Sequence, residues 1–588
     1  MLDRNAIEVG LGRRPADVVF RGGQLVNVCT AEIYPAEVAV AGDKVAAIGN
    51  VSATIGPDTE VIDVAGAYMV PGLIDTHVHT EVTKMSITSF ARAVLPHGTT
   101  AVHTAFDQIS PVKGIDGVRY MLDEAAELPL RVFNDPASKI PYTTPPSTLA
   151  ASIGPRDHEI AFTWPEVTGI AETTFDFIRL GDEDVFDSIA QCEARRLVVH
   201  AHAPFVTGLE LAGYLNCGAR DDHECYSVEE TIEKLRNGMY CLLREASISH
   251  NVVDCIKAVT EAHLSSRHVS LCSDDTDTST LLELGHMDHI VRLVISQGVD
   301  PLTAIQMATL NAAEALRLDD RIGAIVPGRF ADILLVPDLQ AFRVAATYVG
   351  GKLIARDEQM ALELRPPARP ADMLQTFNLT PLTPEDLAFH TDLPDGKARV
   401  ITMYIPPSGS FVRKRRDAEL LVQEGIIWPD PASDVLYVAV VERYNDTGSR
   451  STAFMSGYGL REGAMATSLS PDDENVVCIG ADTLSMATAI NRVAELNGGQ
   501  VIARGNEILT ELPLPIAGIM TDLPPEELAA REHKLKDVAR SLGCAVEDPF
   551  MWLIFTPITA IPEYAIIDRG FVEQATLSFV DPVLGPVI

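Results

Sequence analysis

The sequence predicts an α/β protein: a (β/α)8 barrel with a small β-sandwich domain built from both flanks and a C-terminal α+β domain. Three observations lead to this expectation. Apolar runs alternate with helical stretches in the centre of the chain, strand-like segments lie on both sides of that centre, and a proline-rich segment follows. At 588 residues, the chain is too long for one hydrophobic core. The expected domains are residues 1–70 with 322–365, residues 71–321, and residues 371–588.

The two flanks share a strand-rich texture. Residues 17–28 and 37–48 each read as a β-hairpin with a glycine-containing turn, at Gly22-Gly23 and at Gly42-Asp43 respectively. Residues 331–354 return to the same pattern far downstream. One small β domain assembled from both flanks therefore accounts for all of these segments.

In the central block, strand-like runs precede helical stretches. Residues 73–74 precede an expected helix over 86–95, and residues 269–271 precede one over 279–297. This alternation favours a parallel sheet with crossover helices, and about 250 residues suit a (β/α)8 barrel. A doubly wound open sheet is the alternative, but no glycine-rich phosphate loop follows any of these strands. The other pairs are 100–102 with 113–128, 167–170 with 183–193, and 197–199 with 208–215.

A linker and a further unit complete the chain. Closely spaced prolines in residues 365–370 interrupt both helix and sheet, which predicts a linker. Beyond it, residues 434–441 predict a strand. Asp482 is placed to cap a helix over 483–496, which residues 497–499 would end. These segments predict an α+β domain.

Composition narrows the classes of partner. The net charge of −36 argues against nucleic acid and anionic membranes, since both are polyanions. A solvated acidic surface is the favoured interpretation, with recruitment of a cationic partner as the alternative. The nine scattered cysteines, the lack of a signal-peptide pattern and the lack of a long apolar run predict a cytoplasmic protein with reduced thiols. A homo-oligomer is permitted but not indicated.

Residues 71–79 end in a His-x-His pair. Side chains two apart in a strand point to the same face, so His77 and His79 are expected to project together. Two neutral imidazoles on one side can hold a divalent metal. A pair of this kind is a weak signal by itself, because satisfied surface and core histidines are common.

Polar residues that directly follow the apolar runs strengthen the metal interpretation. Barrel enzymes place their active sites at the carboxyl ends of the strands. Four histidines, one glutamate and one aspartate from separate strand ends can hold two metals, with a carboxylate as the bridge. Hydroxide held between two cations is a good nucleophile at neutral pH. These residues are His77, His79, Glu172, His202, His223 and Asp274.

Several of these residues also have a purely structural interpretation. Glu172 could be a surface acid, and Asp274 with Asp275 could cap the helix that follows. His200 shares a face with His202 but lies earlier in its strand, which favours a packed or supporting histidine. Two further histidines, three residues apart on an expected helix, could pair on a metal, although a plain helix face is favoured: His286 and His289.

These motifs resemble those of a known superfamily. Residues 71–79 resemble the strand-one signature of the amidohydrolase superfamily, and residues 323–333 resemble its return into the small β domain. The match narrows to the adenine deaminase family and covers nearly the whole chain. Further matching segments are residues 167–172, 202–204, 222–224, 273–275, 285–289, 491–499 and 512–518.

The resemblance implies a particular arrangement of metals. His77 and His79 would hold one divalent ion, His202 and His223 a second, and Glu172 would bridge them. The family is associated with iron, manganese or zinc. A mixed set of nitrogen and oxygen ligands does not discriminate among these three metals. The partner implied is a small-molecule, purine-like substrate.

The resemblance also implies roles in catalysis. Asp274 would touch the metal, accept the proton of the attacking water and pass it to the leaving nitrogen. Glu81, beside the histidine pair, is a further candidate acid/base or substrate contact, and a residue that orients a ligand is the alternative. The expected substrate contacts are Asp107, Gln108 and Asp275.

The chain departs from the family at four places. The pair of serines usual after the first glutamate is absent at residues 82–84, and the basic residue usual after the paired aspartates is replaced by Thr276. Where the family carries Asp-Pro-His-Glu, residues 105–108 read Ala-Phe-Asp-Gln, and residues 470–475 lack both histidines of the family's Ala-His-Asp-Ser-His-Asn. Lost histidines can shift the ring recognised and the pH optimum. Hydrolysis of adenine to hypoxanthine and ammonia is the leading hypothesis. The alternatives are an amidohydrolase for another heterocycle or cyclic amide, and a binding protein that kept the fold.

Overall fold

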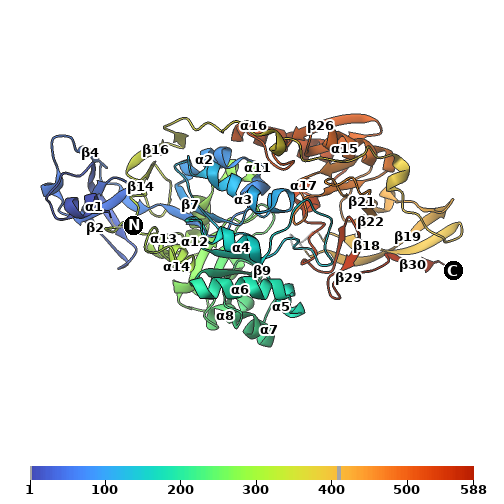
Figure 1. Ribbon diagram of the computed structural model, residues 1–588, viewed down its shortest axis with the longest axis horizontal. Coiled ribbons are helices and arrows are strands. Elements are labelled where there is room, and N and C mark those ends of the chain that lie inside the picture. Colours follow the sequence, from blue (N-terminus) through green and yellow to red (C-terminus); the bar gives the residue numbers. More distant parts are fainter. Residues whose placement is uncertain (1–2, 407–411, 588) are drawn as a thin grey trace.

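A closed barrel of parallel strands occupies the centre of the molecule (Figure 1). The computed structural model describes residues 3–406 and 412–587. β6 to β8 form one parallel sheet and β9 to β13 a second. Bridges from Asn134 to Val167 and from Val78 to Asp274 join the two sheets at both seams, so the (β/α)8 prediction is confirmed. The strands are β6 (Leu73–Asp75), β7 (Thr99–Thr104), β8 (Arg131–Asn134), β9 (Gly169–Thr174), β10 (Val198–His202), β11 (Ala219–Asp222), β12 (Tyr240–Arg244) and β13 (Val269–Cys272).

Helices connect the strands. In α6 (Glu183–Arg195), Asp182 accepts a hydrogen bond from the Val185 N–H as the N-cap, and Val185, Ile189 and Cys192 form the buried stripe. Their spacing of three and four residues explains why this segment is helical. Further helices include α2 (Ile87–Val94), α3 (Ser110–Ala125), α7 (Gly208–Leu215) and α8 (Val228–Arg236).

The prediction of a single helix over residues 279–297 is wrong. The structure has two helices there, α11 (Thr278–Leu284) and α12 (Met287–Ser296). They are separated at Gly285, whose φ of 101° no helix can contain. A side chain at Gly285 would also meet the Asp288 carboxylate at 2.6 Å. The break redirects the chain after α11.

One sheet combines strands from both flanks of the barrel. Its order is β17-β16-β15-β14-β5-β1-β2-β3, with β4 beside β1. The antiparallel pairing of β5 with β14 joins the N-terminal flank to the residues that follow the barrel. The strands are β1 (Val18–Asn27), β2 (Glu32–Ala41), β3 (Lys44–Gly49), β4 (Glu60–Asp63), β5 (Tyr68–Pro71), β14 (Ile333–Val336), β15 (Ala346–Val349), β16 (Lys352–Arg356) and β17 (Gln359–Met360).

The hairpin predicted at Gly22 is also wrong. Residues 18–27 form the continuous strand β1, which carries a bulge between Phe20 and Gly23. A Cβ at Gly23 would meet Val64 at 2.4 Å, so this glycine permits a close approach between segments instead of a turn. The hairpin at Gly42 is confirmed, because β2 pairs with β3 there.

The C-terminal unit combines a large mixed sheet with helices, as predicted. Asp482 caps α15 (Thr483–Glu495), which packs on the sheet, and α16 (Pro525–Ser541) packs against α11 of the barrel. In Figure 1 this unit lies at the opposite side of the barrel from the N-terminal sheet. Its longer strands are β18 (Gly396–Tyr404), β19 (Lys414–Gln423), β21 (Val435–Val441), β22 (Arg450–Ser456), β24 (Val476–Gly480), β25 (Gly499–Arg504) and β26 (Glu507–Pro513).

Buried ion pairs fasten the C-terminal unit to the barrel. Lys84 Nζ lies 2.8 Å from Glu532 Oε1, and both side chains are 3% exposed. Lys536 Nζ lies 2.7 Å from Asp277 Oδ2. These contacts hold α16 against the loops at the carboxyl ends of the barrel strands. Within the described residues, no helix has the length and apolar character needed to cross a membrane.

Candidate active site

Two histidines follow β6 at the mouth of the barrel. His77 Nε2 and His79 Nε2 lie 3.2 Å apart, as the alternation of side chains predicts. Buried Asp75 anchors this segment, because its Oδ1 accepts from the N–H groups of His77 and Ser273, each at 3.2 Å. The same carboxylate accepts from Ser273 Oγ at 2.5 Å. The loop after β6 is therefore tied to the loop after β13.

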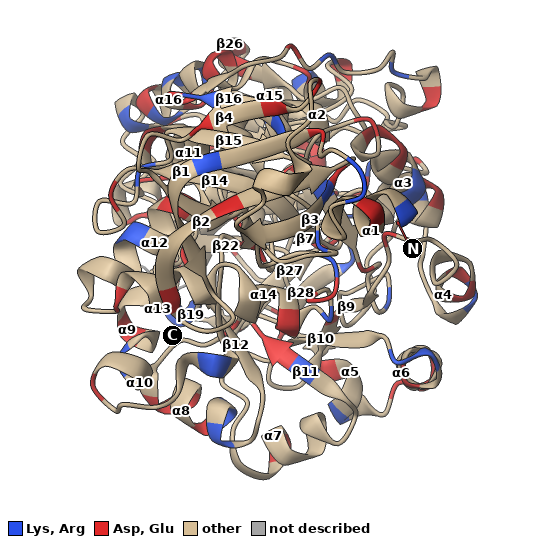
Figure 2. Cartoon of the chain, turned by 90° about the vertical axis from the view of Figure 1, so that its left-hand side faces the viewer, with Lys and Arg blue, Asp and Glu red and all other residues tan. Residues whose placement is uncertain are grey.

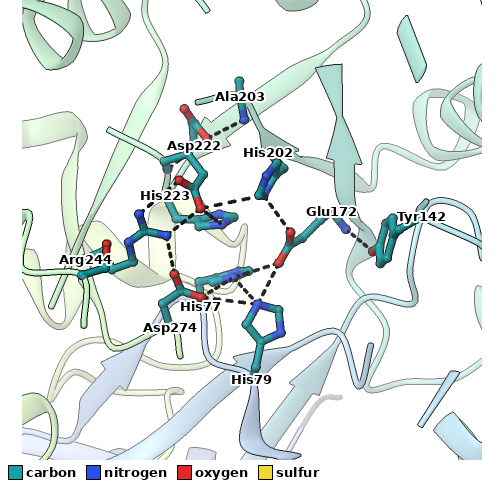
Figure 3. A network of polar contacts seen from close by, with 12 residues as sticks. His77, His79, Tyr142, Glu172, His202, Ala203, Asp222, His223, Arg244 and Asp274 are labelled. Atoms are coloured by element: carbon teal, nitrogen blue, oxygen red, sulfur yellow. Dashed lines mark hydrogen bonds and ion pairs between the residues drawn. The ribbon is translucent and has the colours of Figure 1, made fainter. Parts of the chain in front are cut away.

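Glu172, in β9, joins two groups of histidines (Figure 3). Its Oε1 lies 3.1 Å from His77 Nε2 and 2.9 Å from His79 Nε2. Its Oε2 lies 2.9 Å from His202 Nδ1. The two oxygens of one carboxylate thus face opposite ligand sets, which is the geometry of a bridging ligand.

The second set comes from the ends of β10 and β11. The ring of His223 stacks on that of His77 with centroids 3.8 Å apart and an interplanar angle of 11°. Glu224 Oε1 lies 3.9 Å from His202 Nδ1 and 3.5 Å from His223 Nε2. Glu224 therefore adds a carboxylate to this side of the site.

Asp274, directly after β13, completes the group. Its N–H donates to the His77 carbonyl at 2.9 Å, and its φ of 53° is strained for a non-glycine residue. Its Oδ1 lies 3.5 Å from His77 Nε2 and 3.4 Å from His79 Nε2. Arg244 donates to the other oxygen, Oδ2, at 2.6 Å, and also to Glu224 Oε1 at 2.6 Å. The guanidinium thereby fixes two carboxylates of the site at once.

The donor atoms fit divalent metal ions. Two ligand atoms about 2.1 Å from one ion, at angles of about 90–110°, lie about 3.0–3.4 Å apart, close to the separations seen around Glu172. Glu172 Oε1 and His202 Nδ1 are buried without a hydrogen-bond partner among the described residues. Such atoms are costly to bury unless a cation or donor faces them.

Electrostatics also favour a cation at this point. Burial lowers the pKa of His77, but the neighbouring carboxylates of Asp274 and Glu172 outweigh it and raise the pKa to about 9. Burial raises the pKa of Asp274, but Arg244 and His77 outweigh it, so the pKa lies well below its usual range. The negative carboxylates around these imidazoles therefore attract a positive charge to the site.

A cavity opens over these side chains. Its floor is polar and belongs to the barrel, whereas most of its opposite wall is apolar and belongs to the C-terminal unit. Such a chamber suits a flat heteroaromatic ring whose polar edge faces the floor. The C-terminal residues that line it are Val412, Pro471, Asp472, Phe555, Ile558, Ala560, Ile561 and Pro562.

The three expected substrate contacts line the cavity, whereas the candidate acid/base Glu81 does not. Asp107, Gln108 and Asp275 all line the cavity. Burial raises the pKa of Asp107 to about 8, with Glu172 adding to the shift. Glu81 is buried and is not one of the described residues that line the cavity; its Oε2 accepts from Thr80 Oγ1 at 2.9 Å.

His286 and His289 do not form a metal pair. His286 Nδ1 lies 2.8 Å from Thr99 Oγ1, and its Nε2 lies 3.2 Å from Asp75 Oδ2. Neither histidine belongs to a potential metal-binding group within the described part of the chain. His286 instead supports Asp75, which anchors the loop that carries His77.

Comparison with known proteins decides the family. The model of the amidohydrolase family matches residues 68–354, and that of the adenine deaminase C-terminal domain matches residues 410–577. The chain is 45% identical over 582 residues to adenine deaminase 1 of Desulfotalea psychrophila, covering 99% of this chain and 98% of that protein. It is 46% identical to adenine deaminase 4 of Rhizobium meliloti, over 97% of this chain and 96% of that protein.

This chain belongs to the adenine deaminase family. Membership makes it a hydrolase of C–N bonds, which excludes the hypothesis of a non-enzymatic binding protein. The family and the converging donor atoms together indicate a divalent metal at the site.

Three residues of this deaminase site were missed from the sequence. Arg244 follows the apolar run of β12, so the rule that found Asp274 would have found it too. Glu224 adjoins His223 and could have been included for the same reason. Tyr142 lies in a loop after β8 and carried no signal, yet its hydroxyl accepts from the Glu172 N–H at 2.9 Å and lies 3.0 Å from Asp107 Oδ1.

The departure at residues 470–475 changes the cavity wall. Asp472 lines the cavity in the segment where the family is expected to carry histidines. Burial raises the pKa of Asp472 to about 7, with Glu172 adding to the shift. The change itself is at Pro471, which lines the cavity where the family carries its first histidine, whereas Asp472 takes the position of the family's aspartate.

Proposed function

We propose that this chain hydrolyses adenine to hypoxanthine and ammonia. The single observation that carries the proposal is the convergence of the six predicted side chains, Glu172 among them, at the barrel mouth. It occurs in a chain that is 45% identical to an adenine deaminase over nearly its full length. This full-length similarity favours adenine over the alternative heterocycle or cyclic amide.

We propose two divalent ions of manganese, iron or zinc. His77 and His79 would hold one, His202 and His223 the other, and the two oxygens of Glu172 would bind one each. Bound divalent ions lower the pKa of water and so supply hydroxide at neutral pH. The support is that Glu172 Oε1 faces the first pair and Oε2 faces His202.

Asp274 is positioned to move protons. Arg244 holds its Oδ2, which leaves Oδ1 directed at the histidine pair. Asp274 would accept the proton of the attacking water as the oxygen adds to C6 of adenine. It would return that proton to the amino nitrogen, so that the C–N bond breaks and ammonia leaves.

The purine would lie in the cavity between the two units. Asp107, Gln108 and Asp275 offer hydrogen-bonding groups to its ring nitrogens, and the apolar wall would cover its faces. Because Glu81 lies behind the lining beside His79, we propose that it positions the histidine pair and does not contact substrate.

The test is product analysis with the metal-loaded protein. Hypoxanthine and ammonia should form from adenine in equal amounts, and adenine should be the best substrate in a panel of purines and cyclic amides. Good turnover of another heterocycle without turnover of adenine would reject the proposal.

A further inference from the structure

A second group of potential metal ligands lies inside the barrel, apart from the six residues at its mouth. His103 is in β7, Asp135 directly follows β8, and His200 is in β10. All three are buried, with 1%, 0% and 3% of their surface exposed. Because His200 precedes His202 by two residues on the same strand face, this group occupies the next layer inward.

The three side chains converge on Asp135 Oδ2. His103 Nε2 lies 3.0 Å from this oxygen, and His200 Nε2 lies 2.8 Å from it. None of the three atoms has a partner in hydrogen-bond geometry among the described residues. These three atoms therefore lie close together, but no N–H group of these three residues points along the line between them as a hydrogen bond would require.

The surroundings orient each group for ligation. His200 Nδ1 lies 2.8 Å from Asp221 Oδ2, and a carboxylate can only accept, so Nδ1 carries the hydrogen. The neutral ring then presents the lone pair of Nε2 to Asp135. Asp135 Oδ1 accepts from the N–H and Oγ1 of Thr168 at 2.7 and 2.9 Å, which leaves Oδ2 available. A carboxylate behind a histidine is the usual support of a metal ligand.

A protonated His200 between Asp135 and Asp221 is the competing explanation. It accounts for two carboxylates and one imidazole, but it leaves His103 unexplained. Both nitrogens of His103 are buried without a hydrogen-bond partner among the described residues. An unsatisfied buried polar atom costs about 1–3 kcal/mol, and a metal ion would satisfy His103 Nε2, for which the competing explanation provides only Asp135 Oδ2, an oxygen shared with His200.

We propose that His103 Nε2, Asp135 Oδ2 and His200 Nε2 bind a further divalent transition-metal ion such as Zn²⁺. Two imidazole nitrogens and one carboxylate oxygen are ligands typical of zinc, and water or a fourth group would complete the coordination. The ion would tie β7, β8 and β10 together beneath the layer that carries His202. Its role is structural, and it stands independently of the proposed reaction.

Anomalous diffraction from crystals of the wild-type protein loaded with Zn²⁺ tests the proposal without any substitution. A zinc peak is expected between His103, Asp135 and His200, separate from the density around Glu172. A map with zinc at Glu172 and none between the three atoms overturns the inference while leaving the proposed function intact. Zinc at the inner site together with a lack of adenine turnover would support this inference and overturn the proposed function.

Metal content provides a second measurement. After chelation and reloading with Zn²⁺, His103→Leu should contain one zinc fewer per chain than the wild type. His158→Leu is the matched control, because His158 is also a buried barrel histidine but has Ser188 Oγ and the Ala137 carbonyl as partners, each at 2.8 Å. It should retain the wild-type content. Equal zinc in wild type and folded His103→Leu contradicts the proposal, and if His103→Leu does not fold, the wild-type map decides.

Discussion

At the scale of the residue, the site depends on one buried guanidinium. Arg244 donates to Asp274 Oδ2 and to both oxygens of Glu224, and its Nε donates to Asn251 Oδ1 at 3.1 Å. Because these bonds hold both oxygens of Glu224 and one oxygen of Asp274, the position of Asp274 Oδ1 follows from Arg244. Arg244 is therefore a positioning residue for these two carboxylates, and it also lines the cavity.

Replacing Arg244 with Met should lower kcat for adenine by about a hundredfold, because misplacing a catalytic group by about 1 Å has an effect of that size. It should also destabilise the fold by about 3–5 kcal/mol, since two buried carboxylates lose their partner. Steady-state kinetics and thermal unfolding measure the two effects. Arg244→Lys is the comparison, because it keeps the charge but cannot donate to both carboxylates in the same geometry. An Arg244→Met enzyme with kcat within twofold of wild type would refute the assigned role.

The sequence led to the proposed ligands but not to all of their supports. His77, His79, Glu172, His202 and Asp274 could be predicted because each lies at or directly after a strand end, where a barrel brings side chains together. Tyr142 and Asp472 could not, since a loop and a separate unit bring them to the cavity. Their positions depend on tertiary packing, which no local pattern records.

At the scale of the element, one buried arginine organises the apolar wall of the cavity. Arg413 donates to the carbonyls of Phe555, Tyr564, Ile558 and Ile561, the last two at 2.7 and 3.0 Å. Three of these residues, Phe555, Ile558 and Ile561, line the cavity with Ala560 and Pro562. The segment from α17 (Pro549–Ile554) to β27 (Tyr564–Ile567) thus takes its course around this side chain.

Substituting Met for Arg413 should loosen this wall. We expect the KM for adenine to rise about tenfold. Each hydrogen bond from a charged group contributes about 1.5–3 kcal/mol to the stability of the wall, and only part of this lost stability weakens substrate binding. The change in kcat should be smaller, since the barrel floor is untouched. Initial-rate kinetics separate the two constants.

Arg415→Met is the matched control for that prediction. Arg415 lies two residues away, with 43% of its side chain exposed, and pairs with Asp417 at 2.9 Å. Its loss should leave KM unchanged, as expected for an exposed ion pair. If both variants behave alike, the wall does not depend on Arg413.

Element boundaries show where sequence patterns lose information. The apolar spacing in residues 279–297 continues through Gly285, so periodicity alone could not reveal that α11 and α12 are separate. At Gly23, the glycine that indicated a turn serves a close approach to Val64 within one strand. In both cases, packing against another segment determines the local backbone conformation. The predicted domain boundaries remain a prediction.

At the scale of the whole molecule, acidic groups outnumber basic ones. The net charge is −36, and the colouring of Figure 2 marks acidic residues on many elements, with basic residues interspersed. Repulsion among these charges opposes the compact state. Salt screens such repulsion between exposed groups.

The thermal midpoint should therefore rise with salt. Between about 0.01 M and about 0.15 M NaCl the Debye length falls from about 30 Å to about 8 Å, so most repulsion between distant surface charges is removed. Differential scanning calorimetry at the two concentrations, at constant metal loading, measures the shift. A midpoint that falls with added salt would mean that attractive surface pairs outweigh the excess negative charge.

The central claim is that the carboxylate of Glu172 joins two ligand sets and makes the chain a metal-dependent adenine deaminase. The most direct test compares wild type with Glu172→Gln, which preserves the shape but removes the charge, for metal content and for hypoxanthine formed from adenine. The account predicts robust turnover by wild type and a loss of at least about a thousandfold in the variant, with less bound metal, because the metals supply several kcal/mol. Near-normal deamination by Glu172→Gln, or none by metal-loaded wild type, would contradict it.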